Sequence, residues 1–394
     1  MYNLTIMKII FNDNLIIKSL SDGEIHEYPC DFYDKYVKTL EKMAKSQEWK
    51  YSGIGANFRG DTFNIEQVNT KNSYYTSLDC FGSADKVLFS VTVNEVSGIF
   101  IKDLTAEVDS ESHVIHSHEC VYSGSCPSED NTAVVTSLKE DYVTAHLAIF
   151  NFATNDLSTL TDGDCYDFDA CYSKTNPSKI LFASKGVGRD SDGDFVAYSN
   201  SSILSYDLNG WEIEELFTDK NCSLEKPRDD KNGNFYFIEK AYSGKRGGFF
   251  RTLLDIILVP YRILEALVTF IELFVTSFTG KGFSKTTNSG NLKKANKTKG
   301  EIFIEGNLIN VDKEYKNNLK HKDKFAGYAP HSWKLVKVDS EGNKTVLATS
   351  VIDYVLLPDG SIVYTNGKHV LHIKDGKTEK LADTSMCTQV AVYN

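Results

Sequence analysis

The sequence predicts an all-β fold, a β-propeller of six four-stranded blades, and two observations carry this prediction. Cysteines recur at a step of about 45 residues: Cys80, then Cys120 with Cys126, then Cys165 with Cys171. After each step comes a polar stretch and a strand-like run, at residues 87–90, 133–136 and 180–183. A period of roughly 40 to 50 residues with several short strands per period is typical of propeller blades.

The clearest blade spans residues 165–218. Its expected strands are residues 166–172, 179–184, 203–208 and 211–217. Asn209 and Gly210 are expected to form the turn between the last two strands, because both residue types tolerate the positive φ of tight hairpins. Comparable units are expected at residues 75–117, 119–161, 222 onward and 351–383.

The two ends of the chain are expected to share one blade. Residues 7–11, 15–20 and 24–28 read as three strands without an inner partner, and residues 388–393 read as a lone strand. Pairing them would close the ring and remove its exposed sheet edges. This makes six blades, with residues 31–74 as a candidate seventh that begins with a packing helix at 31–47 and continues with strands at 51–59 and 62–68.

Short motifs in the blade of residues 165–218 carry a family resemblance. They are Phe182-Ala183-Ser184, Arg189-Asp190, Asp194, Tyr206-Asp207-Leu208-Asn209-Gly210 and Leu216-Phe217-Thr218. This pattern resembles the repeat of TolB-like six-bladed propellers and, more broadly, of WD-repeat-like propellers. The resemblance implies the propeller architecture and a role in protein–protein recognition, without a named partner.

A basic insertion interrupts the blades at residues 244–325, so that the propeller would comprise residues 1–243 and 326–394. Residues 241–330 contain 15 Lys and Arg against eight Asp and Glu, whereas the whole chain has a net charge of −11. Such a charge contrast indicates a separate functional element. The acidic remainder argues against nucleic acid as a partner, because binding phosphates requires a concentrated basic face.

Residues 249–278 of the insertion predict an apolar helix with one narrow polar stripe. Its expected docking residues are Phe249, Phe250, Leu253, Leu254, Ile257, Leu264, Leu267, Phe270, Ile271 and Phe274. Exposing about ten large apolar side chains at roughly 1.5–3 kcal/mol each would exceed the stability of a typical domain, so something must cover them.

The apolar surface of this helix can be covered in three ways. It can pack on the propeller or on a protein partner, or it can lie in the surface of an anionic membrane. The membrane alternative rests on a basic flank, Lys245, Arg246, Lys281, Lys285, Lys293 and Lys294. A membrane-spanning helix is disfavoured, because five charged residues would each cost about 2.5–3.5 kcal/mol near the bilayer centre.

Three groups of residues are candidates for chemistry. His116 and His118, near His113 and Cys120, would lie on one face of a shared strand, as a zinc site needs. Asp190, Asp192 and Asp194 resemble a calcium loop but lack the glycine position and the downstream glutamate of an EF-hand. Asp162, Asp164, Asp167 and Asp169 alternate along an expected inner strand, where some would face the central channel.

The leading functional prediction is a non-enzymatic propeller that acts as a recognition or scaffold subunit and docks through the insertion helix. The chain has no Gly-x-Ser-x-Gly elbow and no phosphate-binding loop, and no cofactor is predicted. One alternative is a peripheral membrane propeller; another is a hydrolase or lyase that uses the channel carboxylates. No secretion signal is visible, and reduced buried cysteines are expected, which together predict a cytoplasmic protein.

Overall fold

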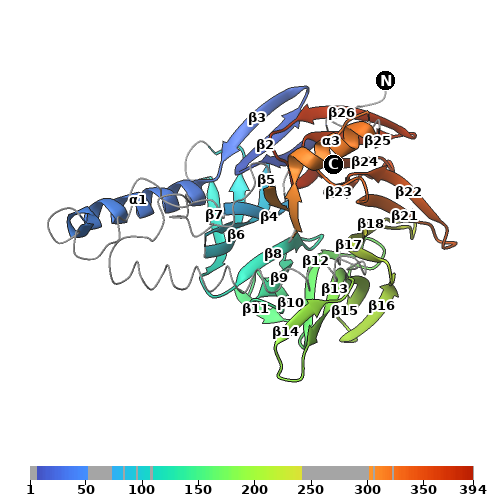
Figure 1. The fold of residues 1–394 in the computed structure, drawn as a ribbon, viewed down its shortest axis with the longest axis horizontal. Coiled ribbons are helices and arrows are strands. Elements are labelled where there is room, and N and C mark those ends of the chain that lie inside the picture. Colours follow the sequence, from blue (N-terminus) through green and yellow to red (C-terminus); the bar gives the residue numbers. More distant parts are fainter. Residues whose placement is uncertain are drawn as a thin grey trace, which may run out of the picture. The chain divides into compact units, whose positions relative to one another are not determined.

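Six four-stranded antiparallel sheets form a six-bladed propeller (Figure 1). The computed structural model describes residues 7–51, 73–82, 85–94, 96–106, 110–241, 301–304, 307–321 and 324–393. The chain divides into two compact units, residues 1–241 with 311–394, and residues 242–310. All six blades belong to the first unit. The predicted insertion bounds of 244–325 stay a prediction.

The first three blades in ring order include blade 1, which both chain ends build. The strands of each blade are given from the inner strand to the outer strand. Blade 1 comprises β27 (Val390–Tyr393), β1 (Lys8–Asp13), β2 (Ile16–Ser21) and β3 (Glu24–Pro29); blade 2 comprises β4 (Ser73–Cys80), β5 (Lys86–Val93), β6 (Val96–Asp103) and β7 (Glu111–Ser117); blade 3 comprises β8 (Val121–Pro127), β9 (Ala133–Lys139), β10 (His146–Asn151) and β11 (Asp156–Thr159).

The second half of the ring follows the same plan. Blade 4 comprises β12 (Cys165–Tyr172), β13 (Lys179–Arg189), β15 (Ser202–Asp207) and β16 (Glu212–Phe217), with β14 (Phe195–Tyr198) paired to the end of β13; blade 5 comprises β17 (Cys222–Asp229), β18 (Phe235–Ala241), β21 (Lys334–Val338) and β22 (Lys344–Thr349); blade 6 comprises β23 (Asp353–Leu356), β24 (Ile362–Thr365), β25 (His369–Lys374) and β26 (Lys377–Asp383).

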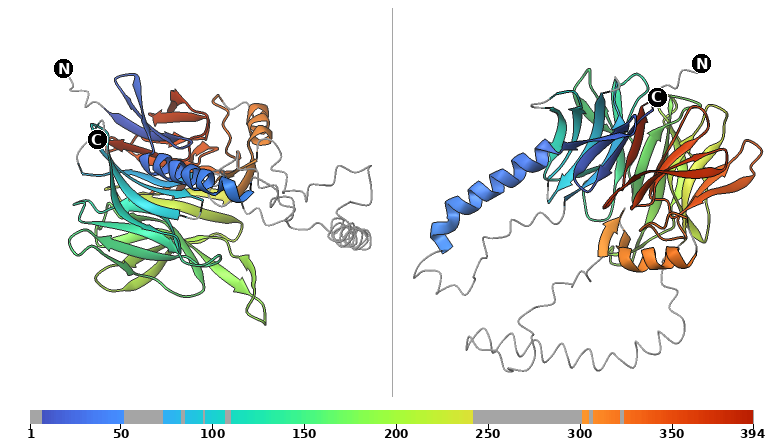
Figure 2. Two further views of the ribbon diagram at one scale, coloured as in Figure 1. Left: turned by 90° about the vertical axis from the view of Figure 1, so that its left-hand side faces the viewer. Right: turned by 90° about the horizontal axis from the view of Figure 1, so that it is seen from above.

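Within the described residues, two helices and one two-stranded hairpin lie outside the blades. They are α1 (Asp31–Tyr51), α3 (Val311–Lys320) and the hairpin of β19 (Glu301–Ile304) with β20 (Asn307–Asn310). The first unit carries both helices on one side of its ring (Figure 2).

The predicted closure of the ring by the two chain ends is confirmed. Strand β27 pairs with β1, from Lys8 opposite Tyr393 to Phe11 opposite Val390. The Asn12 carboxamide oxygen also accepts hydrogen bonds from the backbone N–H groups of Thr388 and Gln389, at 2.9 and 2.8 Å. The closing blade therefore has no unpaired inner strand.

The candidate seventh blade is not among the sheets of the described residues. Its first part is α1, and the strands expected at 51–59 and 62–68 lie almost wholly outside the described residues. The Glu111 carboxylate accepts the backbone N–H groups of Asp31 and Phe32, each at 2.8 Å, which caps the start of the helix. Phe32, Tyr33 and Tyr36 pack on the core between blades 1 and 2, so the helix is anchored by its first turns.

A repeated bulge accounts for two cysteines of the period, Cys126 and Cys171. Gly124, Asp169 and Lys226 have φ of 59°, 55° and 53°, and each lies where the inner strand of its blade shifts register. A Cβ atom on Gly124 would lie 3.1 Å from the backbone nitrogen of Asp169, so glycine permits the close approach of blades 3 and 4. Two residues after each bulge come Cys126, Cys171 and, in blade 5, Arg228.

Two further predictions, free cysteines and a turn at Asn209-Gly210, can be compared with the structure. All eight cysteines are free, but the expectation that they are buried holds only for Cys30, Cys171 and Cys387, and the other five are half-buried. The turn at Asn209-Gly210 is in the predicted place, but its positive φ belongs to Trp211, at 58°. The Asp207 carboxylate accepts the N–H groups of Asn209 and Gly210, at 2.8 and 3.3 Å, and this holds both residues in the turn without positive φ.

Buried ion pairs join blade 5 to its neighbours. Lys226 of β17 lies 3.1 Å from Oδ1 of Asp353 in blade 6, and both side chains are almost wholly buried. The other oxygen of Asp353 accepts the N–H of Val390 at 2.9 Å, and the Tyr354 hydroxyl donates to the carbonyl of Lys226 at 2.8 Å. Blades 5, 6 and 1 thus meet at one carboxylate.

Replacing Asp353 with asparagine should destabilise the ring strongly. The variant keeps the shape of the side chain but removes the buried charge that faces Lys226, and breaking such a pair costs about 3–5 kcal/mol. Urea unfolding of Asp353→Asn should show this loss. The control is Glu214→Gln, since the pair of Glu214 with Lys179 is exposed and should contribute less than about 1 kcal/mol; equal losses in the two variants would contradict the argument.

Candidate functional site

An aromatic cluster crosses blades 3 and 4 where their strands begin and end. Tyr166 and Tyr198 have ring centroids 5.6 Å apart, and Phe195 lies 4.8 Å from Tyr198. The Tyr198 hydroxyl donates to the carbonyl of Val143 at 2.7 Å, which ties the β13–β14 hairpin to the loop of blade 3. Tyr142, in the same loop, is 94% exposed. We call the four aromatic residues, Tyr142, Tyr166, Phe195 and Tyr198, the aromatic edge.

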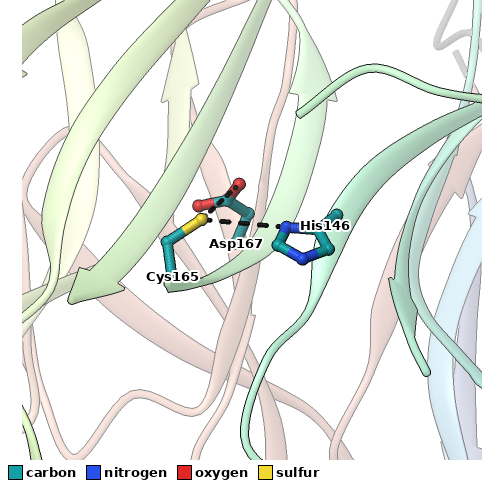
Figure 3. Close-up of side chains that lie close together, drawn as sticks. All are labelled: His146, Cys165 and Asp167. Carbon is teal, nitrogen blue, oxygen red and sulfur yellow. Dashed lines mark hydrogen bonds between the residues drawn. The ribbon is translucent and has the colours of Figure 1, made fainter. Parts of the chain in front are cut away.

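His146, Cys165 and Asp167 converge beside the aromatic edge (Figure 3). The Cys165 Sγ lies 3.8 Å from Nδ1 of His146 and 3.4 Å from Oδ2 of Asp167. Residues 165 and 167 lie on the same side of β12 because side chains alternate along a strand. The parallel bridge between Ala145 and Tyr166 places the first residue of β10, His146, next to them.

The electrostatics of this cluster disfavour a thiol nucleophile. Burial, followed by the nearby carboxylate of Asp167, raises the pKa of Cys165 to about 12. A thiol with this pKa is protonated near neutral pH, whereas a nucleophilic cysteine has a lowered pKa. Asp167 also contacts the thiol, not the imidazole of His146, so the three residues are not arranged as a Cys–His–Asp relay.

The predicted channel carboxylates do not form an acid–base pair. Asp164 is exposed and pairs with Arg189 at 2.8 Å. Asp167 is buried, and its Oδ2 accepts the hydroxyl of Thr161 at 2.6 Å. Asp169 accepts the N–H of Lys226 from the next blade at 3.1 Å. The expected alternation from 162 to 169 is wrong, because β12 begins only at Cys165 and bulges at Asp169.

The calcium candidates lie in the β13–β14 hairpin. One carboxylate oxygen of Asp190 accepts the N–H groups of Asp192 and Asp194, each at 3.0 Å. The Asp190 side chain therefore stabilises its own turn. The side chains of all three aspartates are exposed.

The histidine candidates do not share one strand, so that expectation is wrong. Strand β7 ends at Ser117, and the chain turns through His118 before β8 begins. His116 Nδ1 lies 2.5 Å from His113 Nε2, a hydrogen-bonded pair on the exposed outer strand. Two nitrogens bound to one zinc ion would lie roughly 3.3 Å apart, given Zn–N bonds of about 2.0–2.1 Å in a tetrahedron.

The predicted docking elements lie outside the described residues. These are the apolar positions from Phe249 to Phe274 and the basic flank from Lys245 to Lys294. Within the described part of the chain, no helix is both long and apolar enough to cross a membrane. The docking residues stay a prediction.

The inner strand of blade 5 carries an ionic cluster that the cysteine period did not reveal. Arg228 lies two residues after the bulge, its guanidinium 5.9 Å from the ring centroid of Tyr354. Burial acts to lower its pKa, but Cys171, Asp353 and Asp79 together raise it, so the group stays charged. Burial in turn raises the pKa of Asp79, partly offset by Arg228. The sequence signal was the charged run at residues 225–230, which is unusual for an inner strand.

Glu225 occupies the same strand between two lysines. It lies 2.6 Å from Lys240 in its own blade and 3.2 Å from Lys185 in blade 4. Burial alone would raise the pKa of this carboxylate, but the two lysines lower it from 4.5 to about 2.

Similarity to known proteins is confined to the architecture. No protein-family model matches the chain, and no curated protein matches it. Among solved structures, TolB from Acinetobacter baumannii matches with a TM-score of 0.50 at 10% identity, over 98% of this chain and 66% of that one. A nidogen/laminin complex structure (0.48; 8%; 98% of each chain) and a puromycin-hydrolysing peptidase of Mycobacterium tuberculosis (0.43; 8%; 97% and 44%) are more distant.

The TolB match shows the fold alone: the chain is a six-bladed β-propeller with a fold similar to that of TolB. It spans 66% of the length of that TolB chain. The likeness to WD-repeat propellers is not confirmed.

The lowered pKa of Glu225 predicts a pH-dependent contribution to stability. A depressed carboxylate pKa stabilises the fold above the unfolded value near 4.5, and this gain is lost as pH falls toward 2. Glu225→Gln should therefore lower the free energy of unfolding by about 3 kcal/mol at neutral pH, and this gap in unfolding free energy between wild type and variant should narrow below pH 4.5. Urea unfolding over a pH series measures the gap, and a gap that stays constant down to pH 2 would refute this.

Proposed function

We propose that the protein is a non-enzymatic recognition propeller, a scaffold subunit that binds a protein partner through the segment inserted in blade 5. One observation carries the proposal: the carboxylates predicted for catalysis are each used by the ring itself. Asp164 pairs with Arg189, Asp167 accepts from Thr161, and Asp169 accepts from the backbone of the next blade. A glycosidase-type mechanism needs two carboxylates facing one substrate, which these three do not provide.

The way in which blade 5 is built supports a separate role for the inserted segment. Strands β18 and β21 pair directly, from Phe235 opposite Val338 to Glu239 opposite Lys334, although residues 242–333 separate them. The sheet thus forms without a strand from the insertion. A sequence of some 30 mostly apolar residues, at 249–278, therefore calls for an explanation other than completing the blade.

A protein partner explains this segment better than a membrane surface. The polar stripe of residues 249–278 is narrow, and its charges are spaced to pair with one another along a helix, as in Arg251 with Asp255. Interfacial helices usually have a broad, strongly charged face. A helix with apolar residues around most of its circumference instead suits a hydrophobic groove.

Removing residues 246–298 should leave a folded ring. This deletion retains α3, whose Asn318 carboxamide donates to the carbonyls of Gly327 and Ala329, at 2.9 and 2.8 Å, and so belongs with the ring. Circular dichroism should keep its β-type spectrum, and thermal unfolding should stay cooperative, because propeller stability resides in the contacts between blades. Aggregation with loss of the β spectrum would place the segment in the core and overturn the proposal.

The double variant Leu267→Glu with Phe270→Glu should abolish partner binding or self-association without unfolding the ring. The matched control, Thr269→Glu with Thr276→Glu, adds the same charge on the polar stripe and should bind normally. Crosslinking in cells with mass spectrometry, and sedimentation of the purified protein, provide the readouts. If the wild type instead floats with anionic liposomes at low salt, and only the apolar variant fails to float, the membrane alternative replaces the partner.

A further inference from the structure

We propose that His146, Cys165 and Asp167 form a binding site for a zinc-type transition-metal ion, independent of the proposed recognition role. The three side chains come from two blades, and one ligand atom from each lies within 4.8 Å of the other two. Among the described residues, this is the one group of three His, Cys, Asp or Glu side chains that converges in this way.

The two separations that involve the Cys165 sulfur match a tetrahedral ion. Zinc binds a thiolate at about 2.3 Å and a nitrogen or carboxylate oxygen at about 2.0–2.2 Å, so sulfur and either partner atom should lie roughly 3.5 Å apart in a tetrahedron. The observed separations are 3.4 Å from sulfur to Oδ2 of Asp167 and 3.8 Å from sulfur to Nδ1 of His146. These two separations require displacements of a few tenths of an ångström, whereas the ligand atoms of His146 and Asp167, which lie within 4.8 Å of each other, must come to roughly 3.4 Å.

The donor set selects the class of ion. Thiolate and imidazole are borderline-soft ligands that suit Zn²⁺ and its neighbours in the transition series, whereas Ca²⁺ and Mg²⁺ require mainly oxygen. Three protein ligands leave a fourth position for water, and the partial exposure of His146 and Cys165 allows water to reach it. This is the open arrangement of three protein ligands and a solvent molecule.

The surroundings of the cluster favour a bound cation. The half-buried Cys165 sulfur lies 3.4 Å from a carboxylate oxygen of Asp167. A divalent ion bound between them would deprotonate the thiol and neutralise the two negative ligands. Outside the ligand set, the Thr161 hydroxyl donates to Oδ2 of Asp167 at 2.6 Å and accepts the N–H of Leu147 at 2.9 Å, so the carboxylate is held in place.

Cys222 offers a matched comparison within the same fold. It begins the inner strand of blade 5 as Cys165 begins that of blade 4, and its sulfur likewise lies 3.4 Å from a carboxylate oxygen, that of Glu239. Its pKa is also raised by burial, to about 11. Within the described part of the chain, no histidine joins this second pair to make a group of three. Cys222 should therefore bind no ion.

The test is metal binding by the purified full-length chain after dialysis against a chelator. Titration with Zn²⁺ should show one equivalent bound and about one proton released at neutral pH, and Co²⁺ should give a thiolate-to-metal charge-transfer band. Cys165→Ser should lose the band and at least tenfold in affinity, and His146→Gln should lose affinity similarly. Cys222→Ser and the double variant His116→Gln with His118→Gln should behave as wild type.

Several outcomes would overturn the site. They are Cys165→Ser binding as tightly as wild type, loss of binding in the His116/His118 variant, or a Co²⁺ complex without the charge-transfer band. Thermal unfolding in the chelator distinguishes misfolding from ligand loss, because a folded variant should melt like the metal-free wild type. If Cys165→Ser melts earlier than that, Cys165→Ala and His146→Asn replace it in the titration, with the same criteria.

Discussion

The inner strand of blade 5 is the constraint on which the ring depends. Within a few residues it presents Glu225 to a lysine of blade 4 and Lys226 to an aspartate of blade 6. Buried charges are tolerable only when they are paired and hydrogen-bonded, and breaking one pair leaves the other charge stranded. Blade 5 is also the blade whose second and third strands are separated by residues 242–333. Its attachment to both neighbours therefore does not rely on chain continuity alone.

The bulges in the inner strands determine where along those strands the buried charged residues lie. Gly124 approaches the backbone of Asp169, and Asp169 accepts the N–H of Lys226, so the left-handed residues of three successive blades lie side by side. Each bulge turns the residue two places later toward the same region. In two blades that residue is a cysteine that packs as a small apolar group, whereas in blade 5 it is Arg228, whose charge requires the carboxylates of Asp79 and Asp353. One backbone feature thus explains why Cys126, Cys171 and Arg228 occupy equivalent positions in their blades.

The fold could be predicted because its signals are local. The cysteine step of 45 residues reports the inner-strand bulge that blades 3 and 4 share. The unpaired strands at the two chain ends follow from alternating apolar residues with turn residues between them. The strand limits around 165–218 and 351–383 agree with β12–β16 and β23–β26 to within a few residues, except for the β13 extension and β14. Strand β14 is apolar, Phe-Val-Ala-Tyr, but it has only four residues and pairs only with β13, so it is too short to show a period of its own.

The site could not be predicted, because its signals are not local: its residues come from two blades that only the folded ring brings together. His146 and Cys165 are 19 residues apart, and only the bridge between Ala145 and Tyr166 brings them together. Conversely, His116, His118 and Cys120 are adjacent in sequence, yet the chain turns to the next blade between them. In a propeller, therefore, neighbours in the sequence around a turn diverge, while residues at the start of strands in successive blades converge. The loop at 140–145 and the β13–β14 hairpin both follow the second strand of their blade, and the inserted sequence of blade 5 also begins after its second strand, β18, so these three blades depart from the repeat at the same point of their sequence.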